Sequence, residues 1–297
     1  MNKVAAVVLN YKNYNDTIEC VDSLLFQKGV NLEIIIVDNN SENESVEVLQ
    51  KKYENNKRIT LFTNDKNLGF NGGNNIGIRY AHDIKGCKFV LVINNDTIFP
   101  NRCIIKQMVE IYSPDIAVIS ADVIGTDACW QAPAFYLQNK LMRQTLFTCF
   151  SVILNYLFSF QLKWLIMQKR KFISGKKEFH KKVIEKQSRM DSINAYIIQG
   201  SAFMLTPCFF IFYKQLYPRT YLYWEEICLS WYLHKAKLKT ILANNHPIVH
   251  KDNRSFSYGL NTEQVQPLKR KLMVSGLFKA LPLFFMSYKM IDRTYNN

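Results

Sequence analysis

The hydrophobic pattern of the first 125 residues predicts strands and helices in alternation. Apolar runs at residues 3–10, at residues 32–38 and from residue 89 onward each end in polar side chains. None of the three runs alternates with period 2, and continuous Val/Ile/Leu runs are typical of strands covered on both faces. Helical patterns lie between the runs, which indicates βαβ units and a parallel sheet. The three polar strand ends are therefore expected to line one crevice.

The intervening helices are read from apolar stripes and caps. Residues 18–25 and 104–112 each place apolar side chains on one helical face. Ser41 and Glu44 have the spacing of a capping box, which predicts a helix start at that point. Further strands are expected at residues 59–63 and 116–121.

The run from Phe89 stops at Asn94, Asn95 and Asp96. Ligands of open α/β sheets bind outside the carboxyl ends of the strands, and a carboxylate there is suited to hold a divalent cation against a phosphate-bearing ligand. An ordinary Asn/Asp turn after a strand is the simpler interpretation of the same residues. The repetition of the pattern at three strand ends favours a ligand site.

Residues 67–77 contain four glycines and no charge. We predict a backbone-dominated loop followed by a helix from Asn74, whose free N–H groups would suit a diphosphate. The segment matches neither the dinucleotide fingerprint nor the P-loop, which disfavours an NAD enzyme or an ATPase. A tight strand-to-helix connection without a ligand is the alternative.

Six ordered segments together resemble the nucleotide-sugar glycosyltransferases of family 2 with the GT-A fold, and more narrowly their bacterial rhamnosyltransferase-like members. The segments are VVLNYKNYNDTIECVDSL, IIIVDNNS, NLGFNGGNN, LVINNDT, GSAFML and YLYWEE. The resemblance covers most of residues 1–125 and 195–255, but neither residues 128–191 nor the C-terminal tail. It implies a Rossmann-like, mostly parallel sheet flanked by helices. The regions outside the resemblance are expected, from their own apolar and basic residues, to form a helical membrane-associating insert and a C-terminal helical tail.

The resemblance also implies a donor site and a metal site. Asn94–Asn95–Asp96 occupies the DxD position with Asn in place of the first Asp, so that Asp96 is the charged ligand of a divalent cation, Mg²⁺ or Mn²⁺. His250 is a further metal or phosphate contact, or else an ordinary surface histidine. The implied donor-binding residues, with Asp38 on the base edge, are Asn10, Tyr11, Asp38, Asn39, Asn67, Gly69, Gly72, Gly73, Asn94 and Asn95.

The expected catalytic centre is Glu225–Glu226, which follows an aromatic cluster. Relatives usually have Glu-Asp here with the Asp as base, and another Asp two residues later, where this chain has Cys228. An aromatic wall can raise the pKa of a carboxyl group and stack on a sugar, so Glu226 is favoured as general base and Glu225 is second. A solvated acidic helix start is the alternative. The implied acceptor-binding residues are Trp224, Gly200 and Ser201.

The resemblance thus implies a single inverting displacement by a metal-assisted glycosyltransferase. The donor would be dTDP-rhamnose or, next, a UDP-hexose, and the acceptor a hydroxyl of a lipid-linked polysaccharide or oligosaccharide of the cell envelope. A catalytically degenerate nucleotide-sugar-binding protein or a membrane scaffold is the alternative, because both the DxD and the acidic motif are altered.

The net charge of +14 is concentrated in one region. Residues 163–189 hold ten Lys/Arg against two Glu, directly after the uncharged, apolar residues 146–162. Such a sequence predicts binding to an anionic membrane surface; a buried helical subdomain and a span over residues 145–162 are the alternatives. A second anchor is expected in the tail, where residues 269–271 are basic and residues 272–290 are apolar and broken by Pro282; a C-terminal helix that packs on the domain or mediates oligomerisation is the alternative. Nucleic-acid binding is disfavoured because no recognisable module accompanies the basic cluster.

Location and domains follow from the remaining sequence. The chain starts directly with a strand pattern and has seven cysteines without C-x-x-C pairs, which predicts reduced core thiols in a cytoplasmic protein on the inner face of the cell membrane. We expect a nucleotide-sugar-binding half, an apolar and basic helical insert, an acceptor-binding and catalytic-base half, and an amphipathic tail, at residues 1–125, 126–190, 191–262 and 263–297.

Overall fold

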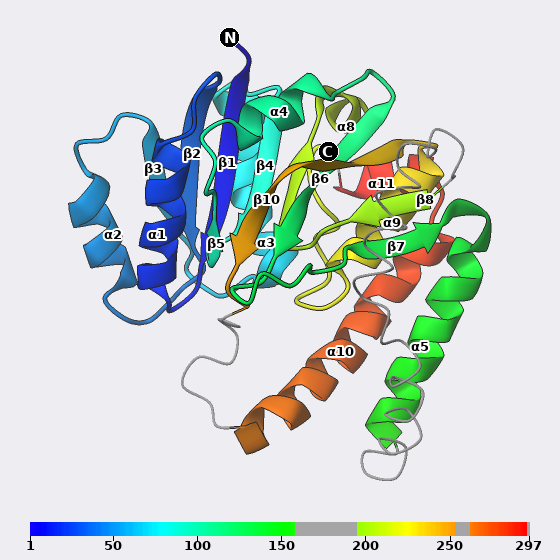
Figure 1. Ribbon diagram of the computed structural model, residues 1–297. Coiled ribbons are helices and arrows are strands. Elements are labelled where there is room, and N and C mark those ends of the chain that lie inside the picture. The colour runs from blue at the N-terminus through cyan, green and yellow to red at the C-terminus, as the bar shows by residue number, and fades with distance from the viewer. Residues whose placement is uncertain (158–194, 253–261, 296–297) are drawn as a thin grey trace.

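The computed structural model describes residues 1–157, 195–252 and 262–295, and within them one large twisted sheet organises the fold (Figure 1). Its strand order is β3-β2-β1-β4-β9-β6-β10-β5, and β7 and β8 form a separate pair. The strands are β1 (Lys3–Asn10), β2 (Asn31–Asp38), β3 (Ile59–Thr63), β4 (Phe89–Asn94), β5 (Thr97–Ile98), β6 (Ile116–Ile124), β7 (Ala134–Leu137), β8 (Ala195–Ile198), β9 (Ala202–Leu205) and β10 (Lys239–His250).

The helices in the first half of the chain are α1 (Tyr14–Leu25), α2 (Ser45–Tyr53), α3 (Gly69–Arg79), the π-helical turn η1 (Tyr80–Ile84) and α4 (Ile104–Glu110). Those in the second half are the 3₁₀ turn η2 (Gln138–Lys140), α5 (Leu141–Leu157), α8 (Pro207–Phe212), α9 (Glu225–Lys235), α10 (Thr262–Phe285) and α11 (Tyr288–Tyr295).

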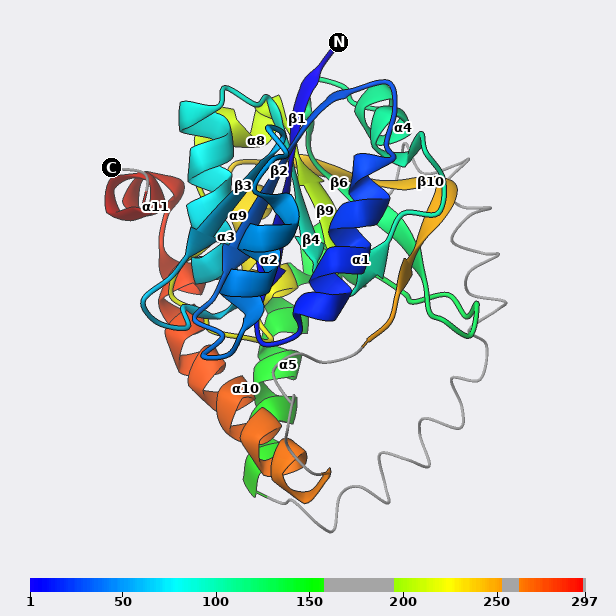
Figure 2. The same ribbon diagram turned by 90° about the vertical axis from the view of Figure 1, so that its left-hand side faces the viewer.

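The predicted parallel core is confirmed. β1 pairs in parallel with both β2 and β4, and the register places Asn10 beside Asp38 and Leu9 beside Asn94. Side chains of each strand alternate between two apolar clusters. Val4, Ala6 and Val8 pack towards α1, α2 and α4, whereas Ala5 and Val7 pack towards α3 and the C-terminal helices (Figure 2). Both faces of these strands are therefore covered, as their continuous apolar sequence predicts.

The prediction of a glycine-rich loop at residues 67–77 was wrong. Helix α3 begins at Gly69, not near Asn74, and it contains all four glycines, with Gly69 as its first residue. A Cβ atom on Gly73 would lie 2.5 Å from Leu9 Cδ1, and one on Gly77 would lie 2.5 Å from Val7 Cγ1. The glycines at this spacing allow α3 to pack closely on β1, which outweighs their low helix propensity.

Two further local predictions were wrong. The capping box of Ser41 and Glu44 does not form; α2 begins at Ser45, and the Ser41 hydroxyl donates to Asp38 Oδ2 instead. The thiols are free as expected, but Cys129 is exposed and does not belong to the core. In both cases a neighbouring polar loop, which the local pattern does not reveal, sets the environment.

The second half of the chain completes the sheet beside β4. β9 runs antiparallel between β4 and β6, and β10 pairs in parallel with β6 and antiparallel with β5. This last pairing sets His250 opposite Thr97, next to the polar end of β4. The polar residues after β4 therefore meet a strand from far along the sequence.

Helices α5 and α10 lie side by side and project from the body beyond the sheet (Figures 1 and 2). Pro282 does not break α10, which continues to Phe285, so the predicted interruption was wrong. The structure has no helix with the length and apolarity to cross a membrane within residues 1–157, 195–252 and 262–295. The basic residues 163–189 and the end of the span considered above lie outside the described residues.

Candidate functional site

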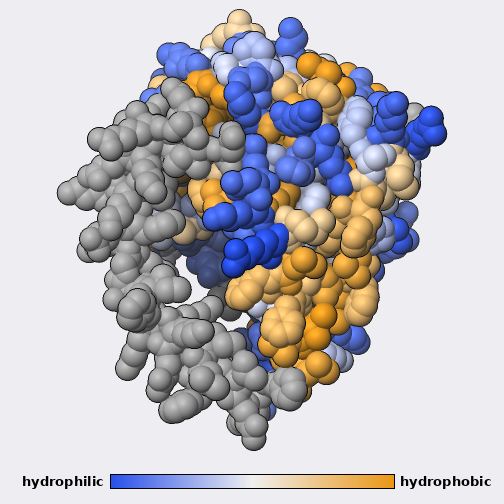
Figure 3. Space-filling model, turned by 90° about the vertical axis from the view of Figure 1, so that its right-hand side faces the viewer, coloured by the Kyte–Doolittle hydropathy of each residue, from blue (hydrophilic) through white to orange (hydrophobic). Residues whose placement is uncertain are grey.

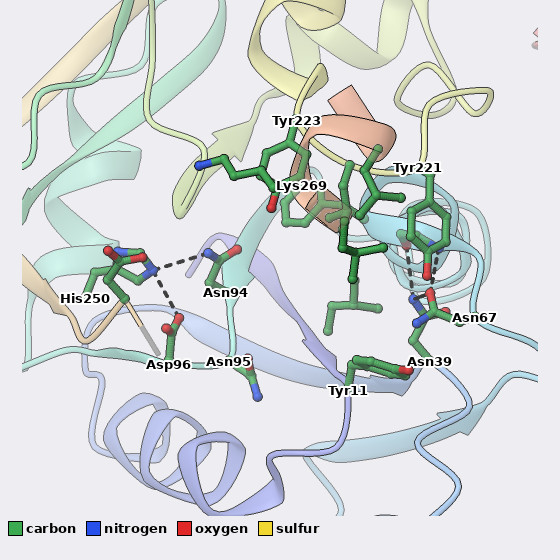
Figure 4. Close-up of a pocket in the computed structure, with 17 residues that line it drawn as sticks. Tyr11, Asn39, Asn67, Asn94, Asn95, Asp96, Tyr221, Tyr223, His250 and Lys269 are labelled. Carbon is green, nitrogen blue, oxygen red and sulfur yellow. Dashed lines mark hydrogen bonds and ion pairs between the residues drawn. The ribbon is translucent and has the colours of Figure 1, made fainter. Parts of the chain in front are cut away.

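A cavity of about 620 Å³ opens at the carboxyl ends of the parallel strands (Figure 4). Its floor consists of polar side chains that follow β1, β2 and β4, and its other wall comes from the segment before α9 and from α10. The polar and aromatic residues that line it include Tyr11, Asn39, Asn67, Asn94, Asn95, Asp96, Tyr221, Tyr223, His250, Asp252 and Lys269.

Asp96 and His250 meet at one end of this cavity. The His250 Nε2 atom lies 3.1 Å from Asp96 Oδ1, and both side chains are largely buried. The backbone holds the pair in place, because the Lys251 N–H donates to the Asp96 carbonyl over 3.0 Å next to the β5–β10 pairing. The structure thus brings the two predicted metal ligands together, although sequence spacing alone gives no reason for them to be adjacent.

Gln131 fixes the orientation of the His250 ring, and sequence reasoning missed it. Its side-chain amide donates to the His250 carbonyl over 3.3 Å, which turns its Oε1 towards His250 Nδ1 at 2.7 Å. In the tautomer with the proton on Nδ1, that N–H donates to Gln131 Oε1, and Nε2 can offer a lone pair to a cation beside Asp96. Metal-binding histidines usually donate their second ring N–H in this way.

The Asp96–His250 arrangement fits a divalent cation as a minimal protein site. A lone pair on Nε2 that faces a carboxylate oxygen is favourable when a cation is shared between them. The described part of the chain offers no group of three or more His, Cys, Asp or Glu side chains that could hold a metal. Diphosphate oxygens and water would therefore have to supply the remaining ligands, as they commonly do for Mg²⁺.

Asn94 and Asn95 serve different purposes. Asn94 Nδ2 lies 3.4 Å from His250 Nε2, and its backbone N–H donates to the Ser201 carbonyl over 2.9 Å. The Asn95 side chain donates to Asn13 O and to Thr17 Oγ1, both over 3.0 Å. Asn95 thus ties the turn after β4 to the start of α1, while Asn94 faces the Asp96–His250 pair (Figure 4).

An amide network organises the opposite end of the cavity. Asn39 Nδ2 donates to Asn67 Oδ1 over 2.9 Å and to the Gly69 carbonyl over 3.1 Å. The Gly69 N–H donates back to Asn67 Oδ1 over 2.9 Å. Gly69 has φ +74°, a conformation that favours glycine, and lines the cavity, whereas Gly72 and Gly73 do not. The start of α3 is therefore held in place before any ligand binds.

Asn10 and Asp38, both predicted to contact the nucleoside, are fully buried and do not line this cavity. Asn10 Nδ2 donates to Asp38 Oδ2 over 2.6 Å, and the Ser41 N–H donates to Asp38 Oδ1 over 3.0 Å. In this conformation the carboxylate shapes the loop that follows β2. Tyr11 is the residue of this group that reaches the cavity.

Helix α10 contributes a cation to the cavity, which sequence reasoning also missed. Leu268, Lys269 and Leu272 line its wall, and Lys269 Nζ lies 5.3 Å from the centroid of the Tyr223 ring. The basic residues 269–271 at the start of the apolar tail were the available signal, but they suggested only a membrane contact. Of these three basic residues, the tertiary fold directs Lys269 towards the sheet edge.

Glu225 and Glu226 line a different, enclosed cavity of about 10 Å³, the volume of about one water molecule at most. Burial and the neighbouring Glu226 raise the pKa of Glu225 to about 8, and burial also raises the pKa of Glu226. The Tyr223 N–H donates to Glu225 Oε1 over 3.0 Å, and the same tyrosine lines the large cavity. Tyr223 therefore stands between the two cavities.

The three predicted acceptor-binding residues lie behind the large cavity. Trp224 is 1% exposed and donates to the Met273 carbonyl over 2.8 Å, so its ring offers no face to a sugar in this conformation. Gly200 packs directly on Glu226, because a Cβ atom there would lie 2.2 Å from Glu226 Oε1. Ser201 is buried and receives the Asn94 N–H at its carbonyl. The aromatic side chains that line the large cavity are instead Tyr11, Phe70, Tyr221 and Tyr223.

Sequence comparison adds family evidence to this geometry. The family model described as Glycosyl transferase family 2 matches residues 5–217. The succinoglycan biosynthesis protein ExoO of Rhizobium meliloti is 28% identical over 127 residues, which are 42% of this chain and 34% of that protein. The low-salt glycan biosynthesis hexosyltransferase Agl10 of Haloferax volcanii is 27% identical over 128 residues, which are 43% of this chain and 38% of that protein. The matched part thus spans well under half the length of these curated relatives.

Solved structures are similar in fold. The mannosyltransferase PcManGT from Pyrobaculum calidifontis, solved in complex with GDP-Man and Mn²⁺, has a TM-score of 0.54 at 11% identity and covers 94% of this chain and 73% of its own. S. aureus TarS 1-349 has a TM-score of 0.51 at 12% identity, with 98% and 74% covered. At these identities the likeness concerns the architecture of the sheet and its helices.

Proposed function

Because the chain belongs to glycosyl transferase family 2, with the GT-A fold of its structural neighbours, we propose that it transfers a sugar from a nucleoside-diphosphate donor to a hydroxyl group. The observation that carries this proposal is the Asp96–His250 pair at the sheet edge, in a cavity large enough for a nucleotide. The same cavity holds an ordered amide network at its other end. Together these features support a donor with a polar base or ribose at one end and a diphosphate at the other.

Asp96 and His250 Nε2 would hold the divalent cation, Mg²⁺ or Mn²⁺, of the donor complex. When bound, the cation supplies positive charge to the diphosphate oxygens. Lys269 faces the same cavity and would add charge to the leaving group from the opposite wall, as a point charge on a flexible stem. Tyr11, Tyr221 and Tyr223 would surround the nucleoside and the sugar.

The Glu225–Glu226 pair is the candidate base. A carboxylate with a raised pKa accepts a proton from the acceptor hydroxyl as that oxygen bonds to the anomeric carbon, and the bond from that carbon to the diphosphate breaks. One bond forms at the carbon and one breaks, so that the product has the inverted configuration. In the present conformation the pair lines the small cavity and not the large one, which supports a step in which the Tyr223 segment moves before transfer.

The proposal extends to the donor sugar, its nucleotide and the acceptor. The two curated relatives are named for glycan biosynthesis, which supports a glycan acceptor. The sequence resemblance favours rhamnose from dTDP, with UDP-hexoses next. A lipid-linked acceptor and a position on the inner membrane surface would suit the helices α5 and α10, since α10 lines the cavity and α5 packs on α10.

Nucleotide binding tests the proposal directly. The melting temperature of the purified protein is measured with dTDP, UDP or GDP, each with and without Mn²⁺. A ligand that binds the folded state alone raises stability by RT ln(1 + [L]/Kd), so we expect a metal-dependent rise with at least one nucleotide. Asp96→Asn should remove the metal dependence, while Glu54→Gln, an exposed acid on the far side of the sheet, should keep it.

No stabilisation by any nucleotide in a folded sample would contradict the proposal. Equal stabilisation with and without Mn²⁺ would support nucleotide binding but contradict a metal site at Asp96 and His250. Nucleotide binding without sugar transfer to any envelope-lipid extract would favour the degenerate nucleotide-sugar binder.

A further inference from the structure

Helix α5 carries an exposed apolar stripe along its whole length. Leu146, Phe147, Phe150, Ile153 and Leu157 lie at helical spacing, and Phe147 is 71% exposed. The stripe extends about 17 Å along the helix axis at the α-helical rise. Figure 3 shows apolar residues gathered on this side of the molecule, where α5 faces the viewer. Contiguous exposed apolar surface of this kind marks an interaction site.

The core fixes which face of α5 is exposed. Leu141, Thr145 and Val152 are buried, and the Trp231 indole N–H donates to Thr145 Oγ1 over 3.0 Å. Leu141 and Val152 belong to the same apolar cluster as the helices that cover the sheet. Because the opposite face of α5 is already packed in the core, rotation of the helix would not bury the exposed stripe. Its apolar surface needs a partner from outside the described part of the chain.

A basic groove of about 490 Å³ lies at the start of the stripe. Lys140, Arg143, Tyr136 and Phe147 line it, so that two cations adjoin the first exposed aromatic ring of the stripe. Helix α5 contains no acidic residue. Within the described ranges, neither Lys140 nor Arg143 forms an ion pair with a carboxylate. The groove thus has the positive charge and the volume to receive a phosphate group.

Position relative to the cavity narrows the kind of partner. α5 packs against α10, and α10 lines the donor cavity with Leu268 and Lys269. Both helices project from the edge of the sheet at which the parallel strands end (Figure 1). A surface that docks on α5 would therefore lie beside the mouth of the catalytic cavity.

We propose that α5 docks the enzyme on an anionic phospholipid bilayer, with the apolar stripe among the upper acyl chains and Lys140 and Arg143 on lipid phosphates. An in-plane amphipathic helix with cations on its flank binds membranes in this way. The basic flank, together with the strong net positive charge of the chain, favours an anionic bilayer over a second copy of the same basic surface. Docking of this kind deepens the proposed function and rests on it for its purpose, which is to bring a lipid-linked acceptor to the cavity.

Vesicle sedimentation with the full chain tests the proposal without any nucleotide. We expect the wild-type protein to bind phosphatidylcholine vesicles that contain about 30 mol % phosphatidylglycerol, and to bind pure phosphatidylcholine much more weakly. Phe147→Ser/Phe150→Ser, which leaves every charge in place, should weaken binding about tenfold. Lys140→Gln/Arg143→Gln should weaken binding to the anionic vesicles about 20-fold.

Two matched variants control for apolarity and charge. Ile84→Ser/Ile211→Ser removes two exposed apolar side chains elsewhere, which are 71% and 74% exposed, and should leave vesicle binding unchanged. Lys51→Gln/Lys57→Gln removes two exposed lysines from the α2 region and should weaken binding less than twofold, within long-range screening. All variants change exposed residues, so their melting temperatures should match the wild type.

Absence of binding to anionic vesicles would overturn the proposal, and so would an unchanged affinity of the Phe147→Ser/Phe150→Ser variant. A concentration-dependent dimer that this double substitution dissociates, with no vesicle binding, would assign the stripe to a second copy instead. Because nucleotide binding is measured separately, failure of docking and failure of the proposed transferase function are distinguishable.

Discussion

The Asp96–His250 centre and the Glu225–Glu226 centre differ in how ready they are for chemistry. The first lies in an open cavity of about 620 Å³, and its histidine is oriented by Gln131. The second lines a small cavity of about 10 Å³, where burial and the neighbouring Glu226 raise the pKa of Glu225 to about 8. In the proposed mechanism the donor end of the site would thus be formed in advance, while the base end would have to open and, with its raised pKa, to lose a proton.

Tyr223 contacts both the large cavity and the Glu225–Glu226 pair. It has φ +77°, a strained conformation for a residue other than glycine, and its N–H donates to Glu225 Oε1. Its ring lines the donor cavity beneath Lys269. In the proposed mechanism, a donor that contacts the Tyr223 ring would act on the same segment whose N–H holds the Glu225 carboxyl group.

The largest expected effect separates the base from the donor site. Glu226→Gln should lower the rate of transfer by about 10²- to 10⁴-fold, because a general base contributes about that much. Donor affinity should stay within about twofold, since Glu226 does not line the donor cavity. The measurement is nucleoside-diphosphate release beside a binding titration. A loss confined to Glu225→Gln would exchange the roles of the two residues.

The second prediction concerns Gln131, which acts through His250. Gln131→Leu should weaken Mn²⁺ affinity of the nucleotide complex about 10- to 100-fold, because the ring loses the acceptor for its Nδ1–H. Gln131→Glu retains an acceptor and should recover most of the affinity. The readout is a Mn²⁺ titration followed by melting temperature. Equal behaviour of the two variants would show that Gln131 only stabilises the fold.

The third prediction uses the raised pKa of Glu225, which is about 8 because of burial and Glu226. Between about pH 5 and pH 8 the unfolded chain has lost this proton while the folded chain keeps it, so unfolding releases a proton. The free energy of unfolding should therefore fall as pH rises through this window, by on the order of 4 kcal/mol for this group. Urea denaturation at several pH values should show a smaller fall for Glu225→Gln. If the free energy of unfolding of Glu225→Gln fell as much as that of the wild type, a group other than Glu225 would cause the pH dependence.

The smallest expected effect concerns Lys269, which lines the cavity from α10. Lys269→Gln should weaken affinity for the nucleoside diphosphate about fivefold, as expected for one partly exposed cation near a phosphate. Lys271→Gln changes an exposed neighbour on the same helix and should have no effect. Calorimetric titration at low salt measures both. If both variants weakened the affinity equally, Lys269 would act only through the general positive charge of α10 and not through a direct contact with the diphosphate.

The parallel core could be predicted because its signals are local. Continuous apolar runs, polar strand ends and helical stripes lie within short windows, and β1, β2, β3, β4 and β6 appear close to their expected positions. Asp96 was found for the same reason, as the carboxylate that follows a buried strand. The family motifs brought His250 into the expected site, although no local pattern does.

The errors concern residues whose role depends on distant partners. The glycines after Asn67 resemble a loop, yet Gly73 and Gly77 serve helix packing on β1. Trp224 resembles a sugar platform, yet the carbonyl of Met273 holds it in the core. Gln131 and Lys269 reach the site through the tertiary fold, and neither stands in a motif that would single it out.

The pairing of β10 with β5 also decides when this protein can first work during its synthesis. Asn94 and His250, which meet in the site, are 156 residues apart in sequence. A ribosome releases the parallel core first, when β4 and β6 still lack β9 and β10 as neighbours. Such unpaired edges invite association with other chains. The growing polypeptide thus depends on protection until residue 250 has emerged, and truncated products that end earlier should form aggregates without nucleotide-binding activity.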